Sequence, residues 1–425
     1  MTDAGFDALS ASGASPSGPA ARSSVVRVGA ATAVTALCGY VVLYLAARDL
    51  EPAGFSVFAV FWGAFGLVSG AAFGLLQEAT REVRSAAHAE MTGTQRTRPM
   101  WVAAVVGVVS AVAIALSSPL WSEHVFVDAR WLSVTLLAVG LAGICLHATL
   151  LGILAGLDRW TAYGSLMVTD AGLRVLVAVV TFLVGWGLAG YLWATVAGAV
   201  AWLIMLIASP ATLRAATLLT PVGTATFLRG AAHSVTAAGA SAILVMGFPV
   251  LLQATSGDLG AAGGVVILAV TLTRAPLLVP LTAMQGNLIA HFVDQRAHRL
   301  RALAAPALVV TGAGLIGVLA AWTVGPWLLR SGFGAEYRAD GALLAWLTGG
   351  AIAIGLLTLT GAAAVAAALH RAYSLGWVSA TVASTLLLLL PLDLQTRTVI
   401  ALLCGPVVGI AVHLAALSSV CWPRS

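Results

Sequence analysis

Ionisable side chains are rare in this sequence, and a few of them stand inside long apolar runs. Asp170 and Arg174 are four residues apart in one such run, 161–184. Residues at this spacing share one face of an α-helix, so the two side chains can pair. Two interpretations stay open: a structural ion pair that fixes helix packing, and a gated pair whose arginine binds an anionic substrate group.

Arg274 is the second candidate, in the segment TLTRAPLLVP. Pro276 and Pro280 follow it, and proline removes a backbone hydrogen bond and kinks a helix. No acidic residue stands near Arg274 in the sequence, and a phosphate group would supply the missing negative charge through bidentate contacts. We therefore predict that Arg274 binds substrate beside a kink. The alternatives are that it reaches the membrane surface or pairs with Asp170 or Glu78.

A third group ends another apolar run. Gln77, Glu78 and Arg81 stand within five positions, and Glu82 adds a second acid. Glu78 and Arg81 are three residues apart and can pair on a helix. We predict a cytoplasmic gate or a packing clamp, with proton coupling through Glu78 as the alternative. His233 can titrate near neutral pH and is a further gate or coupling candidate, although a lone histidine is usually just hydrogen-bonded.

The residue types also exclude chemistry. All 21 basic residues are arginine, so a Walker A loop and a lysine Schiff base are both impossible. The cysteines show no CxxC or metal-ligand spacing, and we expect them to be small buried residues; they are Cys38, Cys145, Cys404 and Cys421. We predict no catalytic residues, no metal, no cofactor and no enzymatic activity.

The composition identifies the environment of these residues. The chain is 60% hydrophobic and 9% charged, with a mean hydropathy of +0.99, whereas soluble domains carry about 25% charged residues. A pI of about 9.4 would suggest nucleic acid as a partner of a soluble protein. Here most arginines stand in short segments between apolar runs, so we predict an integral membrane protein with no nucleic-acid partner.

Apolar runs long enough to span a bilayer recur along the chain. A hydrocarbon core of about 30 Å needs about 20 residues per helix. The predicted spans are 25–47, 54–78, 100–120, 131–157, 161–184, 188–208, 226–252, 261–284, 303–325, 341–366, 374–392 and 398–420. We therefore predict an all-α integral membrane protein of about twelve transmembrane helices, in two six-helix bundles related by a pseudo-repeat.

Arginine placement orients these spans. With a cytoplasmic N-terminus, fourteen arginines lie in cytoplasmic segments and five in outer loops, which follows the positive-inside rule. Both termini are then cytoplasmic. The segments GLLQEATREVR (74–84) and MQGNLIAHFVDQR (284–296) occupy corresponding places about 210 residues apart, a pattern typical of transporter repeats.

These features divide the chain into four predicted parts. They are a disordered cytoplasmic tail (1–24), an N-terminal bundle (25–208), a cytoplasmic linker (209–225) and a C-terminal bundle (226–425).

The segment from Leu50 to Glu82 resembles the start of polysaccharide-biosynthesis flippases, which belong to the multidrug/oligosaccharidyl-lipid/polysaccharide exporter superfamily. The matching positions are Leu50, Pro52, Phe55, Phe58, Gly74, Leu75, Arg81 and Glu82. Ser56 departs from the pattern, where the family usually has glycine. The resemblance covers about 33 residues. It implies a twelve-helix, two-bundle exporter that moves lipid-linked glycans from the inner to the outer leaflet by alternating access. We also predict that the protein lies in a bacterial inner membrane.

Three functions remain open at this stage. The first is a flippase for a polyprenyl-diphosphate-linked glycan or similar lipid, possible partners being enzymes of envelope glycan synthesis. The second is a membrane glycosyltransferase that uses a polyprenyl-phosphate sugar, with Asp49 or Glu51 as its acid. The third is a drug or small-solute antiporter of the same superfamily, with Asp170 or Glu78 as the coupling carboxylate.

Overall fold

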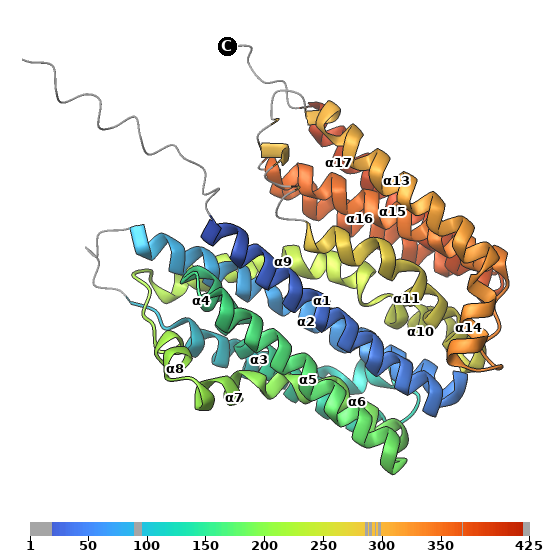
Figure 1. Ribbon diagram of the computed structural model, residues 1–425, viewed down its shortest axis with the longest axis horizontal. Coiled ribbons are helices and arrows are strands. Elements are labelled where there is room, and N and C mark those ends of the chain that lie inside the picture. Colours follow the sequence, from blue (N-terminus) through green and yellow to red (C-terminus); the bar gives the residue numbers. More distant parts are fainter. Residues whose placement is uncertain are drawn as a thin grey trace, which may run out of the picture.

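The computed structural model describes residues 19–88, 96–284, 299–367 and 369–419, together with 288, 291–293 and 295. Nearly all of these residues are helical (Figure 1). The predicted tail at 1–24 falls mostly outside the described residues, and the first helix begins at Pro19. Much of the segment 284–296 also lies outside them, so its correspondence with 74–84 stays a prediction.

The helices follow one another with short connections. In the first half they are α1 (Pro19–Asp49), α2 (Glu51–His88), α3 (Pro99–Val125), α4 (Arg130–Gly156), α5 (Trp160–Val184), α6 (Gly187–Ala197), the 3₁₀-helix η1 (Gly198–Val200), α7 (Ala201–Ala208) and α8 (Pro210–Ala216). In the second half they are α9 (Thr224–Val245), α10 (Phe248–Ser256), α11 (Gly260–Ala283), α13 (Arg299–Thr323), α14 (Gly325–Phe333), α15 (Gly341–Ala366), α16 (His370–Leu388) and α17 (Leu394–Ser419).

Each predicted span coincides with a helix or a close succession of helices. Within the described chain, ten helices are long and apolar enough to cross a membrane, and the bent pair α9–α10 makes eleven if it counts as one span. The remaining predicted span corresponds to α16, which opens with His370 and Arg371 and is therefore less apolar. The predicted all-α membrane fold is confirmed.

The turn between α5 and α6 is one of the shortest connections between spans. The predicted spans 161–184 and 188–208 leave three residues, 185–187, between them, and α5 and α6 are separate helices as expected. Gly185 and Gly187 adopt left-handed backbone angles, with φ of 70° and 63°. Glycine reaches this conformation without steric cost, which is why so short a turn can reverse the chain.

The expected single span 226–252 is instead two helices. The chain bends by 62° between α9 and α10. Pro249 stands in the first turn of α10, where its missing N–H is tolerated. By contrast, Pro276 and Pro280 lie inside the continuous helix α11. The break in this region thus precedes the helix that carries Arg274.

The two halves meet along α2. Gly70 of α2 lies against Ala242 of α9, and a side chain at Gly74 would overlap the backbone of Ser234 and Val235. Such close approach is typical of small residues at membrane helix interfaces. Figure 1 shows the helices of the first half (blue to green) as one group and α13–α17 (orange to red) as another, with α9, α10 and α11 between them.

The cysteines differ in their surroundings. Cys145 is buried, as expected, but Cys404 is exposed on α17 and Cys38 is half-buried. The expectation of burial is therefore wrong for Cys404. A thiol is apolar enough to stand on the outside of a membrane helix, so the apolar pattern alone did not indicate which way the residue faces. Cys421 lies outside the described residues.

Candidate functional site

Asp170 and Arg174 form the ion pair that their spacing predicts. The Arg174 Nε donates to Asp170 Oδ2 at 3.1 Å, and Nη2 donates to Oδ1 at 3.0 Å. Both side chains are largely buried, with exposed fractions of 16% and 13%. This bidentate geometry is the strong form of a charge-assisted contact. The pair is therefore a close, two-point contact within α5.

The sixth span is shaped around this pair. Arg174 Nη1 donates to the Thr195 carbonyl at 2.6 Å, three residues before the helix tightens into η1 at Gly198. A side chain at Gly198 would overlap the Asp170 carboxylate. A 3₁₀ turn inside a longer helix often marks strain or function. Here it accompanies the close docking of the carboxylate on the backbone.

Two further residues of the first half complete the surroundings, and sequence reasoning did not identify them. The guanidinium of Arg174 lies over the Phe65 ring, 5.3 Å from its centroid. His147 of α4 is buried near enough to interact electrostatically with the pair, and its Nδ1 has no hydrogen-bond partner in the described chain. The signal for His147 was a histidine inside an apolar run. Its neighbours Asp170 and Arg174 lie on another span and are not near it in the sequence.

Arg274 is buried in quite different surroundings. Its exposed fraction is 7%, and its Nη1 donates to the Val245 carbonyl at 3.3 Å. Val245 is the last residue of α9, and the residue four positions later is Pro249, which has no N–H to offer. Arg274 therefore supplies the donor that proline removes. Its guanidinium also lies over Phe248, 5.0 Å from the ring centroid.

The remaining donors of Arg274 are unpartnered. Nε and Nη2 have no hydrogen-bond acceptor among the described residues, and no carboxylate lies within ion-pair distance there. The alternative of pairing with Asp170 or Glu78 is therefore wrong, since Arg174 and Arg81 hold these acids. In Arg174 the corresponding two atoms, Nε and Nη2, donate to the Asp170 carboxylate. A planar fork of this kind fits a carboxylate or a phosphate.

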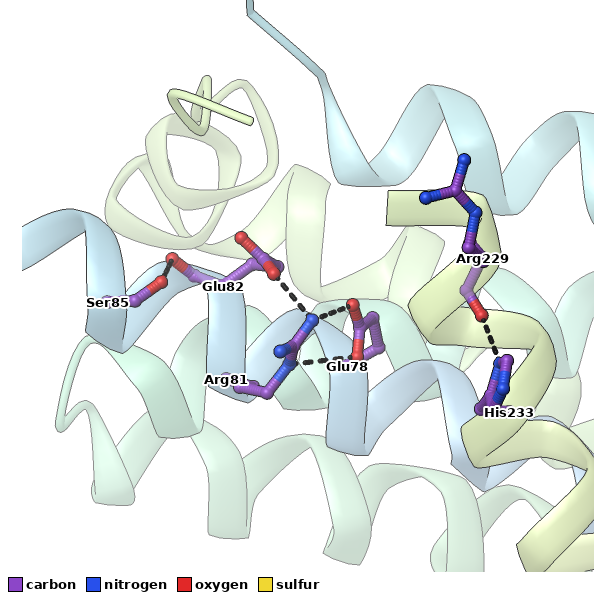
Figure 2. Close-up of polar contacts among 6 residues, drawn as sticks. All are labelled: Glu78, Arg81, Glu82, Ser85, Arg229 and His233. Atoms are coloured by element: carbon purple, nitrogen blue, oxygen red, sulfur yellow. Dashed lines mark hydrogen bonds and ion pairs between the residues drawn. The ribbon is translucent and has the colours of Figure 1, made fainter. Parts of the chain in front are cut away.

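The third group lies in the C-terminal part of α2 (Figure 2). Arg81 Nη2 contacts Glu78 at 2.6 Å and Glu82 at 2.8 Å. Both acids are buried, whereas the Arg81 side chain is 62% exposed. The Glu78 carboxylate lies against Gly230 of α9, where any side chain would overlap it. One arginine thus pairs with two acids at a contact between the halves.

The other two gate candidates stand apart from this cluster. His233 is exposed, and its Nδ1 interacts with the Arg229 carbonyl of its own helix at 2.9 Å (Figure 2). Gln77 is exposed on α2. No hydrogen bond or ion pair in the described chain joins the three charged groups to one another. The candidates therefore form three separate places and not one polar site.

Comparison with known proteins defines the fold. No family model matches the sequence. The chain is similar to a multidrug resistance MATE family transporter of the MOP superfamily in an inward-facing conformation, with a TM-score of 0.69 and 15% identity, over 90% of this chain and 95% of that one. Its TM-score with an outward-facing conformation is 0.61 at 16% identity, over 93% and 96% of the chains. The fold is that of MATE transporters, twelve helices in two bundles.

Close relatives define the family. The chain is 70% identical over 411 residues to the uncharacterized protein Mb3654 of Mycobacterium bovis, covering 96% of this chain and 95% of that protein. It is 69% identical over 418 residues to the uncharacterized protein Rv1510 of Mycobacterium tuberculosis, covering 98% and 95%. The chain belongs to this family of multi-pass membrane proteins with the MATE fold.

Proposed function

We propose that this protein is an alternating-access transporter that flips a lipid-linked oligosaccharide or polysaccharide precursor to the outer leaflet. The observation that carries the proposal is the buried guanidinium of Arg274, whose Nε and Nη2 have no acceptor in the described chain. A buried charge of this kind costs several kcal/mol and marks a functional site in membrane proteins. A diphosphate group offers two negative oxygens to the unpartnered edge.

The sign of the charge favours this substrate over a cationic drug. The two acids that an antiporter would use for coupling, Asp170 and Glu78, are both held by arginines. Arg274 has no such counter-ion among the described residues. A cationic substrate would be repelled at Arg274, whereas a diphosphate would be attracted. The drug antiporter remains the second candidate because the MATE neighbours with this fold include multidrug resistance transporters.

The proposal also covers the orientation of the chain, its membrane and its partners. Both termini lie in the cytoplasm, the protein resides in the bacterial inner membrane, and enzymes of envelope glycan synthesis are its partners. The orientation is supported by the distribution of arginines between alternate loops. The location and the partners rest on the resemblance of Leu50 to Glu82 to polysaccharide-biosynthesis flippases. Labelling of Val127→Cys by a membrane-impermeant maleimide in intact cells checks the orientation, because Val127 lies in an exposed loop between α3 and α4. Labelling of this cysteine only after the cells are permeabilised would mean that the orientation is the reverse of the one proposed.

A binding experiment tests the role of Arg274. The purified protein in nanodiscs is titrated with polyprenyl diphosphate, with polyprenol as the uncharged probe. We expect Arg274→Ala to weaken diphosphate binding about 10- to 100-fold, since hydrogen bonds to charged groups contribute about 1.5–3 kcal/mol, and to leave polyprenol binding unchanged. Arg330→Ala is the matched control, because Arg330 is exposed and, among the described residues, donates only within its own helix.

The outcomes separate the candidates. Equal diphosphate affinity for Arg274→Ala and the unmodified protein would contradict the proposal. Binding of a cationic dye, with no affinity for the diphosphate, would favour the antiporter. Transfer of sugar from a polyprenyl-phosphate donor, lost in Asp49→Asn or Glu51→Gln, would favour the glycosyltransferase.

A further inference from the structure

A tyrosine of the second half is buried against the first half. Tyr337 stands in the connection between α14 and α15 and is 1% exposed. Its hydroxyl donates to the Ala47 carbonyl at 2.9 Å, across 290 positions of sequence. Ala47 belongs to the last turn of α1, where carbonyl groups lack a helical partner. The bond therefore satisfies a helix end of one half with a side chain of the other.

Aromatic contacts surround this hydrogen bond. Tyr337 meets Phe55 of α2 edge-on, with ring centroids 6.2 Å apart. It also meets Phe333 of its own half at 6.1 Å, and Phe333 meets Tyr44 of α1 at 5.6 Å. Edge-to-face pairs at these separations contribute about 0.5–1.5 kcal/mol each beyond burial. The four rings bind the last turns of α1 and the first turns of α2 to the second half.

The same end of the molecule holds another close contact between the halves. A side chain at Gly264, in the first turns of α11, would overlap the Pro52 carbonyl of α2. Figure 1 shows α14 beside the C-terminal end of α1. The halves are thus joined at the end where the chain turns from α1 to α2.

We propose that Tyr337 is a latch that holds this end of the transporter closed and must leave Ala47 when that end opens. The inference rests on alternating access as proposed above, and by the arginine distribution this end faces outward. Burial raises the pKa of the Tyr337 phenol, so the hydroxyl keeps the proton it donates. The latch binds backbone on one side, so it needs no matching side chain on α1.

Spin-label distances test the latch without any transport. Nitroxides are attached at Val127→Cys and Leu392→Cys, two exposed loop positions in different halves, in a chain whose native cysteines are alanine. We expect Tyr337→Phe to increase the population with separated ends about two- to tenfold, the effect of losing one hydrogen bond. Tyr337→Ala removes the ring as well and should increase that population further.

Tyr191→Phe is the matched control. Tyr191 is buried and donates to the Leu45 carbonyl, also in the last turns of α1, but from α6 of the same half. Its loss should leave the distance distribution unchanged. An unchanged distribution in both Tyr337 variants, or an equal shift in Tyr191→Phe, would overturn the latch. A shifted distribution in a protein that moves no lipid would support the latch and count against the proposed function alone.

Discussion

Arg174 and Arg274, both within spans, differ in what lies at the same edge of the guanidinium. Arg174 directs Nε and Nη2 at Asp170, whereas the same two atoms of Arg274 have no acceptor in the described chain. The sequence predicted both as candidates, because a charge in an apolar run is conspicuous. It did not predict that Arg274 donates to the Val245 carbonyl, which Pro249 cannot bond because proline has no N–H. That contact joins two helices and depends on their packing.

The Arg174–Asp170 pair yields a prediction about stability. We expect Arg174→Ala to lower the free energy of unfolding by about 3–5 kcal/mol, because it leaves a buried carboxylate without its partner. The double variant Asp170→Asn with Arg174→Gln should lose much less stability than the sum of the losses of Asp170→Asn and Arg174→Gln measured singly. Denaturation in micelles measures all of them, and additive losses would contradict a coupled pair. Unchanged diphosphate binding by the double variant would favour the structural interpretation over the gated one.

At the scale of the helices, α2 is the element on which the halves converge. It packs against α4 of its own half and against α9 and α11 of the other. Glycines 66, 70 and 74 repeat at every fourth position, and the resulting stripe allows α9 to approach the backbone. The spacing of these glycines is typical of a contact between membrane helices, but it carries no information about which helix fills the groove.

Gly74 therefore should not tolerate a side chain. We expect Gly74→Ala to destabilise the protein by about 1–3 kcal/mol, because the methyl group overlaps backbone atoms of α9, which cannot move aside as a side chain can. Gly172→Ala is the control, since Gly172 has open space around it and alanine favours a helix by about 0.5–1 kcal/mol. Unfolding in the same micelles compares the two, and equal effects would refute a tight α2–α9 contact.

The spans were predictable because bilayer thickness fixes their length and apolar character, and the short helices were not. The segments that became α8, α10 and α14 are seven to nine residues long, too short for a span. Pro249 was a visible signal of the break between α9 and α10, but proline in a membrane helix predicts a break or a kink equally. Tyr337 gave no signal, because its partner is a backbone carbonyl.

At the scale of the whole molecule, contacts between the halves occur at both ends of the helices. Glu78 lies against Gly230 at one end, and Tyr337 binds Ala47 at the other. Alternating access requires one set of contacts to break while the other holds. The proposed cycle therefore uses the arginine-clamped acids near the predicted cytoplasmic end and the tyrosine latch at the predicted outer end.

The most direct test of this account is movement of lipid. The purified protein is reconstituted into liposomes with a fluorescent polyprenyl-diphosphate glycan, and the fraction of probe accessible in the outer leaflet is followed over time. The account predicts protein-dependent movement that Arg274→Ala abolishes and Arg330→Ala preserves. Liposomes in which the probe stays in its leaflet, or in which Arg274→Ala moves it as fast as the unmodified protein, would contradict the account.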